Sequence, residues 1–324
     1  MRQRTVRLAQ VAAITAIFLI SLATGTGTAT AAAGAGLWTS NYVATGETDR
    51  CAFYRDSNNN ICYIDDGGSV ELGVKFTTSE RVLASGVRVY RVDAGAVTGS
   101  LWKADGTLLA TGTFANQAGR GWQDLVFVVP VLLEPYTTYI ASYFAPNADY
   151  AFEWYFFSYS AFTVGPITAV QSVEGNRNGV YCYDFEPCWP LPTNSFRDTN
   201  YWVSPLWAYA FDGFYQPVDN GMWNKAKAGS AIPVKFSLDG NRGLNILKTG
   251  YPKATLVTCP SASTPTDVVE ETVAASTSGL TYDPYADQYV YVWKTDKTWA
   301  GKCYRFELGL KDDTPRTFLV QFFK

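Results

Sequence analysis

Two carboxylates and several aromatic rings lie close together in the middle of the sequence. Cys182 and Cys188 bracket five residues that include Tyr183, Asp184 and Glu186, and Trp189 follows directly. Sugars present apolar ring faces that stack on Trp or Tyr, and hydroxyls that pair with carboxylates. A loop of this composition predicts a carbohydrate-binding surface; the alternative is that the rings fill a sheet interface. The candidate ligand-binding residues are Tyr181, Tyr183, Asp184, Glu186 and Trp189.

The two carboxylates of this loop also have a spacing that a glycosidase could use. On an extended chain Asp184 and Glu186 point the same way, about 7 Å apart, and Glu153 or Asp198 could contribute as well. However, the sequence has 29 acidic residues, so pairs of this kind arise by chance, and a fold does not by itself imply catalysis. We predict no catalytic residues and no enzyme activity.

A second aromatic group precedes this loop in the sequence. Trp154 and Tyr155 are adjacent, and Tyr159 follows in the same stretch. These rings could also stack on a sugar, but we expect them to pack in the core, because large aromatic side chains bury much of their surface.

The absence of His restricts the possible chemistry. The sequence contains no His, which excludes Ser-His-Asp and Cys-His catalysis, His-ligated metals and acid–base catalysis by imidazole. What remains is carboxylate, Lys or Tyr chemistry, or binding without chemistry.

The charge of the chain argues against a polyanionic partner. The formal net charge is −3, with Lys and Arg scattered along the sequence, whereas a nucleic-acid-binding protein concentrates positive charge on one surface. We therefore predict no nucleic-acid partner, and expect a polysaccharide or cell-envelope glycan instead.

The N-terminus has the composition of a secretory signal peptide. Three Arg within the first seven positions precede an apolar run, Leu8–Ala23, and Ala29-Thr30-Ala31 offers a cleavage site, with Ala31-Ala32-Ala33 as an alternative. The apolar run is short for a membrane span. We predict that residues 1–31 are removed, that the mature chain has no membrane span, and that the protein is secreted to the extracellular space.

The cysteines that follow indicate a disulfide-bonded protein. An even number of Cys in an exported chain implies disulfides, and sequence proximity favours the pairs Cys51–Cys62, Cys182–Cys188 and Cys259–Cys303. The last pair closes the longest loop and would stabilise the fold by roughly 4 kcal/mol, the shorter two by about 2–3 kcal/mol. Since there is neither a C-x-x-C motif nor a His, we predict no metal ligands of the zinc type.

Structural calcium is compatible with the composition, because extracellular sandwiches can bind it through Asp, Asn and carbonyl oxygens. Suitable residue types occur at Asp56–Asn60, at Asp65-Asp66-Gly67 and at Asp283–Asp287. None matches the EF-hand loop, and Asp and Asn in turns commonly bond their own backbone. We expect simple turns and no cofactor.

The elements that position these residues are predicted to be strands. Aromatics make up 15% of the chain, and short β-branched and aromatic runs alternate with turn residues. Asp105-Gly106 between two apolar pairs predicts a hairpin. The predicted fold class is all-β: a jelly-roll-like sandwich at residues 37–211, then an immunoglobulin-like sandwich at residues 212–324. Predicted strands include Val70–Phe76, Val87–Val92, Gly99–Lys103, Leu108–Phe114, Gln123–Val129, Thr138–Tyr143, Tyr201–Phe211, Gln288–Trp293, Lys302–Leu308 and Thr317–Phe323.

The first predicted sandwich resembles a known bacterial family. The motifs that carry the resemblance are Val70–Phe76, Gly86–Tyr90, Gly99–Trp102, Gly121–Gln123, Thr138–Asn147, Asn178–Tyr181 and Phe196–Trp202. They are similar to a domain of unknown function (number 4082) of secreted proteins. The resemblance implies a jelly-roll-like fold with carbohydrate binding, and no catalytic residues to transfer. Two cysteine-closed loops depart from the pattern, and could form one binding surface if they lie at the same end.

The second predicted sandwich resembles another module. Pro233-Val234-Lys235-Phe236, followed by Gly243-Leu244 and Gly250-Tyr251-Pro252, is similar to the PxKF domain of secreted bacterial proteins. This resemblance implies an immunoglobulin-like architecture more than an activity. We expect Ser261–Ser278, rich in Ser, Thr, Val and Ala, to be a loop between strands.

Overall fold

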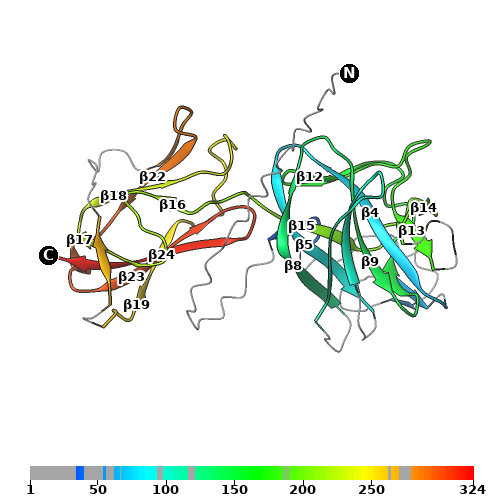
Figure 1. Ribbon diagram of the computed structural model, residues 1–324, viewed down its shortest axis with the longest axis horizontal. Coiled ribbons are helices and arrows are strands. Elements are labelled where there is room, and N and C mark those ends of the chain that lie inside the picture. Colours follow the sequence, from blue (N-terminus) through cyan, green and yellow to red (C-terminus); the bar gives the residue numbers. More distant parts are fainter. Residues whose placement is uncertain are drawn as a thin grey trace, which may run out of the picture. The chain divides into compact units, whose positions relative to one another are not determined.

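The structure is a computed structural model in which nearly every element is a strand (Figure 1). In the described ranges the only helical element is a 3-10 turn at Lys297–Trp299, so the predicted all-β class is confirmed. The predicted signal peptide lies outside these ranges. The described residues are 34–39, 54–55, 62–65, 67–92, 98–115, 121–184, 186, 188, 190–261, 264–269 and 279–324.

Strands β1 to β15 form the N-terminal β-region. Its two larger sheets have the orders β1-β15-β5-β8 and β11-β12-β4-β9-β6-β7, and β13 and β14 join the latter through β4. The first sheet contains β1 (Ala35–Gly36), β15 (Val203–Ala208), β5 (Val82–Arg91) and β8 (Gly121–Leu133). The second contains β11 (Phe162–Val164), β12 (Ile167–Ala169), β4 (Val70–Thr78), β9 (Tyr139–Ala145), β6 (Thr98–Lys103), β7 (Leu108–Thr113), β13 (Val180–Tyr183) and β14 (Asn194–Ser195).

The two sheets pack as layers because alternate residues of their strands are apolar. Val74 of β4, Val89 of β5 and Tyr143 of β9 are buried in one core, as period-2 alternation requires. A third, small sheet has the order β10-β3-β2, with β10 at Asp149–Phe152, β3 at Cys62–Asp65 and β2 at Tyr54–Arg55. The predicted sandwich layering is thus confirmed.

The predicted hairpin at Asp105-Gly106 is also confirmed. It joins β6 to β7, and Gly106 has φ 95°, a conformation that glycine adopts at little cost. The Asp105 carboxylate accepts a hydrogen bond from the Thr107 amide at 2.9 Å, which fixes the turn.

Strands β16 to β24 form the C-terminal β-region and share no sheet with the strands before Phe211. One sheet has the order β16-β18-β22-β21 and the other β19-β23-β24-β17-β20. Phe236, Trp293, Phe306 and Phe318 are buried in its core. The strands are β16 (Phe214–Tyr215), β17 (Trp223–Lys227), β18 (Ala231–Phe236), β19 (Lys253–Val257), β20 (Thr266–Val268), β21 (Leu280–Asp283), β22 (Gln288–Lys294), β23 (Cys303–Gly309) and β24 (Pro315–Phe323).

Two of the predicted disulfides are present, Cys182–Cys188 and Cys259–Cys303. The Cys51–Cys62 pair lies outside the described residues, because Cys51 is not among them. The loop expected at Ser261–Ser278 is wrong at Thr266–Val268, which forms β20 and pairs in parallel with β17. A segment of three residues is too short to show a strand pattern in the sequence. It forms a strand here because it pairs with the edge of β17.

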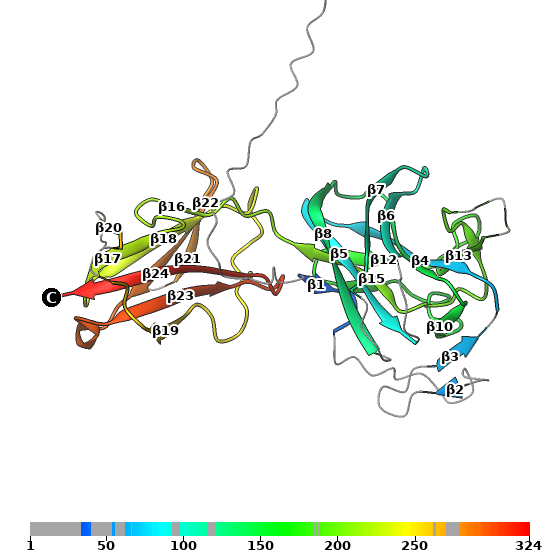
Figure 2. The same cartoon turned by 60° about the horizontal axis from the view of Figure 1, so that its bottom comes forward.

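The N-terminal segment starts earlier than the predicted boundary at residue 37. Strand β1 pairs with β15, with Ala35 opposite Trp207 (Figure 2). The buried Trp38 ring then lies 4.6 Å from the Phe162 ring and 5.2 Å from the Trp202 ring, centroid to centroid. This segment is therefore part of the first sheet and of its core.

The connection between the two β-regions is held by a buried ion pair, which we call the Asp312 clasp (Tyr209, Phe211, Asp312 and Arg316). Arg316 donates to both carboxylate oxygens of Asp312, at 2.6 and 2.9 Å. Asp312 accepts a hydrogen bond from the Tyr209 amide, and Arg316 donates to the Tyr209 carbonyl. The Arg316 guanidinium also lies over the Phe211 ring. The clasp thus satisfies the backbone of Tyr209 on both sides.

No helix within the described residues is both long enough and apolar enough to cross a membrane.

Candidate functional site

The loop closed by Cys182 and Cys188, here called the stapled loop (residues 182–188), uses its carboxylates to hold itself in place. Asp184 accepts a hydrogen bond from the Ser69 hydroxyl at 2.6 Å. Glu186 accepts one from the Tyr183 amide at 2.9 Å and one from the Asn194 side chain at 3.0 Å. Both carboxylates therefore stabilise the loop, so the acid–base pair that a glycosidase needs receives no support from their surroundings.

The two tyrosines of β13 are half-buried beside the core. Tyr181 pairs with Leu72 and Tyr183 with Val70 across β4, and the two tyrosine rings meet edge-on at 5.7 Å. In a strand, alternate side chains share a face, so both tyrosines lie on the side of the buried Leu72 and Val70. Trp189 lies outside the described residues, and its predicted role in binding stays a prediction.

The stapled loop also brings together atoms of a kind that metals bind. Ligand atoms of Cys182, Glu186 and Cys188 lie within 4.8 Å of one another. However, the two sulfurs are bonded to each other, and a metal requires the thiolate. This group is therefore a disulfide with a neighbouring carboxylate and not a metal-ligand set.

Among the predicted calcium candidates, the turn at Asp283–Asp287 lies within the described residues. At Asp283 the carboxylate accepts hydrogen bonds from the Tyr285 and Ala286 amides, the expected pattern of a turn that bonds its own backbone. Asp56–Asn60 and Asp66 lie outside the described residues.

A buried carboxyl group lies directly beside the staple. Glu71 of β4 pairs with Cys182 of β13 and is 4% exposed. It accepts a hydrogen bond from Ser142, whose oxygen accepts one from the Trp102 indole at 2.8 Å. Burial raises the pKa of Glu71 to about 8, while the Ser142 bond acts in the opposite direction. Glu71 is therefore largely neutral at pH 7.

The second aromatic group forms a surface that we call the Arg197 cluster (Trp154, Tyr155, Phe196 and Arg197). The guanidinium carbon of Arg197 lies 4.5 Å from the Trp154 ring centroid, 4.9 Å from that of Phe196 and 5.8 Å from that of Tyr155. These distances are typical of cation–π contacts. Three rings and one cation therefore form a continuous surface feature.

The burial expected for this group is wrong at the tyrosines. Tyr155 is 41% exposed and Tyr159 is 78% exposed, and Phe196 is 50% exposed. Only Trp154 packs inward, with its ring 5.2 Å from the Phe152 ring. The backbone contributes to this exposure: Tyr155 has φ 63°, which turns the chain away from the line of β10, and of the residues that follow Phe157 is buried whereas Tyr159 is exposed.

Two segments that are distant in sequence position the cluster. The Tyr155 amide donates to the Arg197 carbonyl at 2.8 Å, and Glu153 and Asn200 exchange a pair of backbone hydrogen bonds. Arg197 has φ 52°. Left-handed backbone at non-glycine residues costs on the order of 1–3 kcal/mol and persists only when the surroundings impose it. The cluster is therefore preformed by the fold.

One glycine allows the chain before β13 to approach the second of these segments closely. Gly179, just before β13, has φ 68°, and a Cβ there would lie 1.7 Å from the Thr199 carbonyl oxygen. Only glycine fits such a close backbone approach. The sequence thus links β13 to the segment that carries Phe196 and Arg197.

Asp198 lies next to Arg197 but is bound elsewhere. It accepts hydrogen bonds from Ser158 at 2.9 Å and from Arg177 at 3.1 Å. Burial raises the pKa of Asp198, but hydrogen bonds from Ser158 and Ser172 and the charge of Arg177 more than offset this, so its pKa lies below the ordinary value. Asp198 anchors the cluster and pairs with Arg177, not with Arg197.

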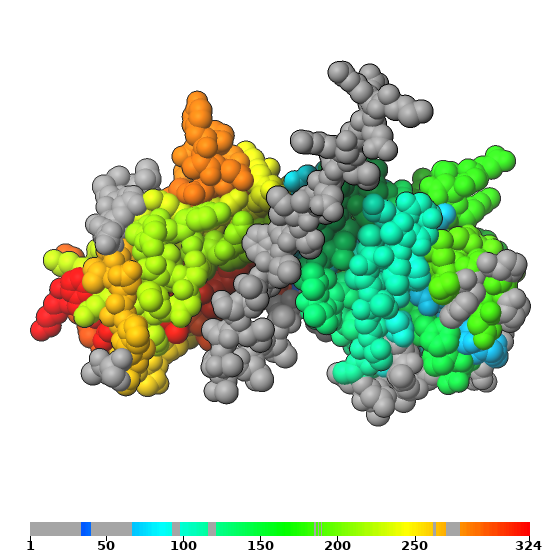
Figure 3. Space-filling model, viewed as in Figure 1, coloured from blue at the N-terminus to red at the C-terminus, as the bar shows by residue number. Residues whose placement is uncertain are grey.

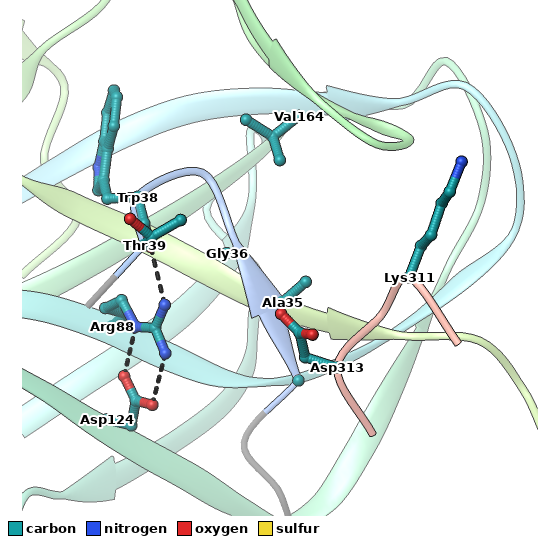
Figure 4. Close-up of a pocket in the computed structure, with 10 residues that line it drawn as sticks. Ala35, Gly36, Trp38, Thr39, Arg88, Asp124, Val164, Lys311 and Asp313 are labelled. Atoms are coloured by element: carbon teal, nitrogen blue, oxygen red, sulfur yellow. Dashed lines mark hydrogen bonds and ion pairs between the residues drawn. The ribbon is translucent and has the colours of Figure 1, made fainter. Parts of the chain in front are cut away.

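A cavity of about 350 Å³ lies beside β1. Figure 4 shows Arg88 and Asp124 on one side and Lys311 pointing away from them. Arg88 donates to both Asp124 oxygens and to the Trp38 carbonyl, and Asp313 pairs with Lys248. The cations and carboxylates that face each other here are already satisfied, so the cavity is a weaker candidate than the Arg197 cluster.

Comparison with known proteins identifies part of the chain. Residues 56–203 match the family model described as a domain of unknown function (DUF4082). This match confirms the resemblance predicted for the N-terminal β-region. No curated protein matches the sequence. The resemblance of the C-terminal β-region to the PxKF domain stays a prediction.

Sequence reasoning did not find Arg197. A single Arg in a turn has no motif; its neighbour Asp198 was considered only as a carboxylate that a glycosidase could use, and Phe196 only as part of a family motif. The signal was the pairing of two turns rich in rings, Trp154-Tyr155 and Phe196-Arg197, which only the fold brings together.

Proposed function

We propose that this protein is a non-catalytic binding protein that recognises carbohydrate through the Arg197 cluster. The observation that carries the proposal is the exposure of Tyr155 and Phe196 around a fixed guanidinium. Aromatic faces stack on sugar rings, and guanidinium N–H groups donate to sugar oxygens. Because the fold already holds these groups in place, little entropy is lost when a ligand binds.

The compartment supports an extracellular ligand. Disulfides form and persist in oxidising compartments, and two are present among the described residues. Together with the predicted signal peptide at residues 1–31, this supports secretion. A polysaccharide or cell-envelope glycan is then the ligand class that the protein meets. The C-terminal β-region would serve as a display or spacer module.

The stapled loop is the alternative carbohydrate site. Tyr181, Tyr183, Asp184, Glu186 and Trp189 were predicted as its ligand-binding residues, but the carboxylates already bond to the loop itself. We rank it second for this reason.

A protein partner is the second candidate function, and strand β8 favours it. Val128 is fully exposed and Val129 is 72% exposed. Residues 127–130 lie between the two stretches of β8 that pair with β5 and do not pair with it themselves. An exposed apolar edge strand is a site where another chain can pair. Substitution of Val128 and Val129 by Lys, followed by light scattering and pull-down from culture medium, tests this candidate.

Binding to a polysaccharide panel tests the primary proposal. We expect the Tyr155→Ala/Phe196→Ala variant to lose at least tenfold in affinity, and Trp189→Ala to change it little. Tyr285→Ala is the matched control, because Tyr285 is fully exposed on the β21–β22 hairpin, which projects from the surface (Figure 3). If the protein binds no polysaccharide, or if only Trp189→Ala abolishes binding, the assignment to the Arg197 cluster is wrong.

A further inference from the structure

We infer that Arg197 binds the carboxylate of an acidic sugar, so that the ligand is a glycan containing uronic acid. This inference rests on the proposed carbohydrate binding at the Arg197 cluster and adds the chemical class of the sugar. It follows from the state of the Arg197 charge, from the carboxylates around it and from the geometry of the guanidinium.

The charge of Arg197 is not paired with a carboxylate in the part of the chain that the structure describes. Its interactions there are the three ring contacts. Other arginines differ: Arg81 pairs with Glu134, Arg177 with Asp198, and the half-exposed guanidinium of each is thereby neutralised. Arg197 therefore combines a fixed position with an uncompensated positive charge.

The carboxylates closest in sequence and fold do not supply the missing partner. Asp198 is engaged by Ser158 and Arg177. Glu153 is buried, at 9% exposure, and Glu174 forms no ion pair with Arg197 in the part of the chain that the structure describes. Among the described residues, then, no carboxylate pairs with Arg197, and a ligand can supply one.

The ring contacts do not satisfy the hydrogen-bond donors of the guanidinium. A ring attracts the positive charge through the ring's own face, whereas the N–H donors, which point outward along the edge of the guanidinium plane, need an oxygen acceptor. No acceptor for the Arg197 side chain is present among the described residues. A carboxylate fits this edge through two parallel hydrogen bonds, a geometry that Lys cannot reproduce.

The same surface explains why the carboxylate should belong to a sugar. Tyr155 and Phe196 lie beside the guanidinium and are exposed, and a uronic acid carries an apolar ring face and a carboxylate on one monosaccharide. Contact with a ring also removes water from the guanidinium, which strengthens its attraction for an anion. A neutral sugar could stack on the rings, but it would leave the Arg197 charge without an anionic partner.

Titration calorimetry of the full chain against three polymers tests this inference. The probes are polygalacturonate, a neutral galactan and a sulfated galactan, each at 50 and 500 mM NaCl. We expect at least tenfold tighter binding of polygalacturonate than of galactan at the lower salt, and loss of that preference in Arg197→Gln. Arg305→Gln is the matched control, because Arg305 is exposed and forms no ion pair within the described residues.

The calorimetric results distinguish failure of the uronic-acid inference from failure of the proposed function. Equal binding of galactan and polygalacturonate, unchanged by Arg197→Gln, overturns the inference and leaves the proposed function standing. Equal or tighter binding of the sulfated polymer overturns the carboxylate assignment. If the wild-type chain binds none of these polymers, and if neither it nor the Tyr155→Ala/Phe196→Ala variant binds any polysaccharide of the wider panel, the proposed function itself is overturned. Arg197→Lys keeps the charge, so a tenfold loss in that variant supports the paired hydrogen bonds, whereas full retention contradicts them.

Discussion

The stapled loop and the Arg197 cluster lie in the same β-region and treat their polar groups in opposite ways. In the stapled loop, Asp184 accepts a hydrogen bond from Ser69, and Glu186 accepts hydrogen bonds from Asn194 and from the Tyr183 amide. In the Arg197 cluster, the guanidinium contacts rings and finds no carboxylate among the described residues. A cross-linked loop rich in acids and rings is therefore not by itself a binding surface. A polar group without a partner among the described residues, such as the Arg197 guanidinium, is a better indicator of a binding site.

The largest effect is expected beside the staple, at Glu71. Its folded-state pKa is raised to about 8 from 4.5, so the unfolded chain loses its proton first as pH rises. Stability then falls between pH 4.5 and about 8, by on the order of a few kcal/mol. Glu71→Gln should remove this fall and raise the melting temperature at pH 8, with little change at pH 4. Melting curves against pH check this.

Glu134→Gln is the control for that experiment, because Glu134 is half-exposed in a surface ion pair, and such pairs contribute little. If Glu71→Gln and Glu134→Gln show the same pH dependence as the wild type, Glu71 is ionised in the folded protein, and the contrast between a buried and an exposed polar site weakens.

The next effect concerns the staple itself. Cys182→Ser/Cys188→Ser should lower the free energy of unfolding by about 2 kcal/mol, because the disulfide closes a short loop. Glycan affinity should stay within twofold of wild type. Denaturant melts and the polysaccharide panel measure both quantities. A large loss of affinity with an intact fold would move the binding site to the stapled loop.

A smaller effect is expected at the anchor of the Arg197 cluster. The pKa of Asp198 lies below its ordinary value, so its contribution is present above about pH 4 and is lost as pH falls through the folded-state pKa. Asp198→Asn should cost about 1–2 kcal/mol at pH 7 and less at pH 3. Asp313→Asn, in a half-exposed pair with Lys248, is the control and should cost under about 1 kcal/mol.

The smallest effect on stability is expected at Phe196. The ring is 50% exposed, so Phe196→Leu should change the free energy of unfolding by no more than about 0.5 kcal/mol. Glycan affinity should nevertheless fall several-fold, because a stacking contact contributes about 1 kcal/mol. Stability loss without affinity loss would make Phe196 a packing residue and erase the difference between the two regions.

The sequence predicted the strands whose pattern is local. Val70–Phe76 and Gln288–Trp293 appear as the cores of β4 and β22, and the turn at Asp105-Gly106 forms the hairpin. It did not predict β20, which exists only because β17 offers an edge. Strand β8 runs on to Leu133 past Pro130, since that proline lies where β8 leaves its pairing with β5.

The candidate site was harder to predict for the same reason. Tyr181 and Tyr183 were predicted as ligand-binding residues, with packing against a sheet as the alternative, and they alternate along β13 on the side of the core. Tyr155 was expected in the core, and its left-handed backbone places it at the surface. Arg197 acquires its role only when two turns pair across the fold, which neither turn reveals alone.

The Asp312 clasp has a practical consequence for dissecting the molecule. In a fragment that stops at Phe211, the Tyr209 amide and carbonyl would lose their hydrogen bonds to Asp312 and Arg316. The complementary fragment would keep the buried Asp312–Arg316 pair without these two bonds to Tyr209. Each fragment would therefore contain polar groups near the cut end that lack their hydrogen-bond partners. Comparisons of ligand binding between the halves are thus best made by point substitution in the intact chain.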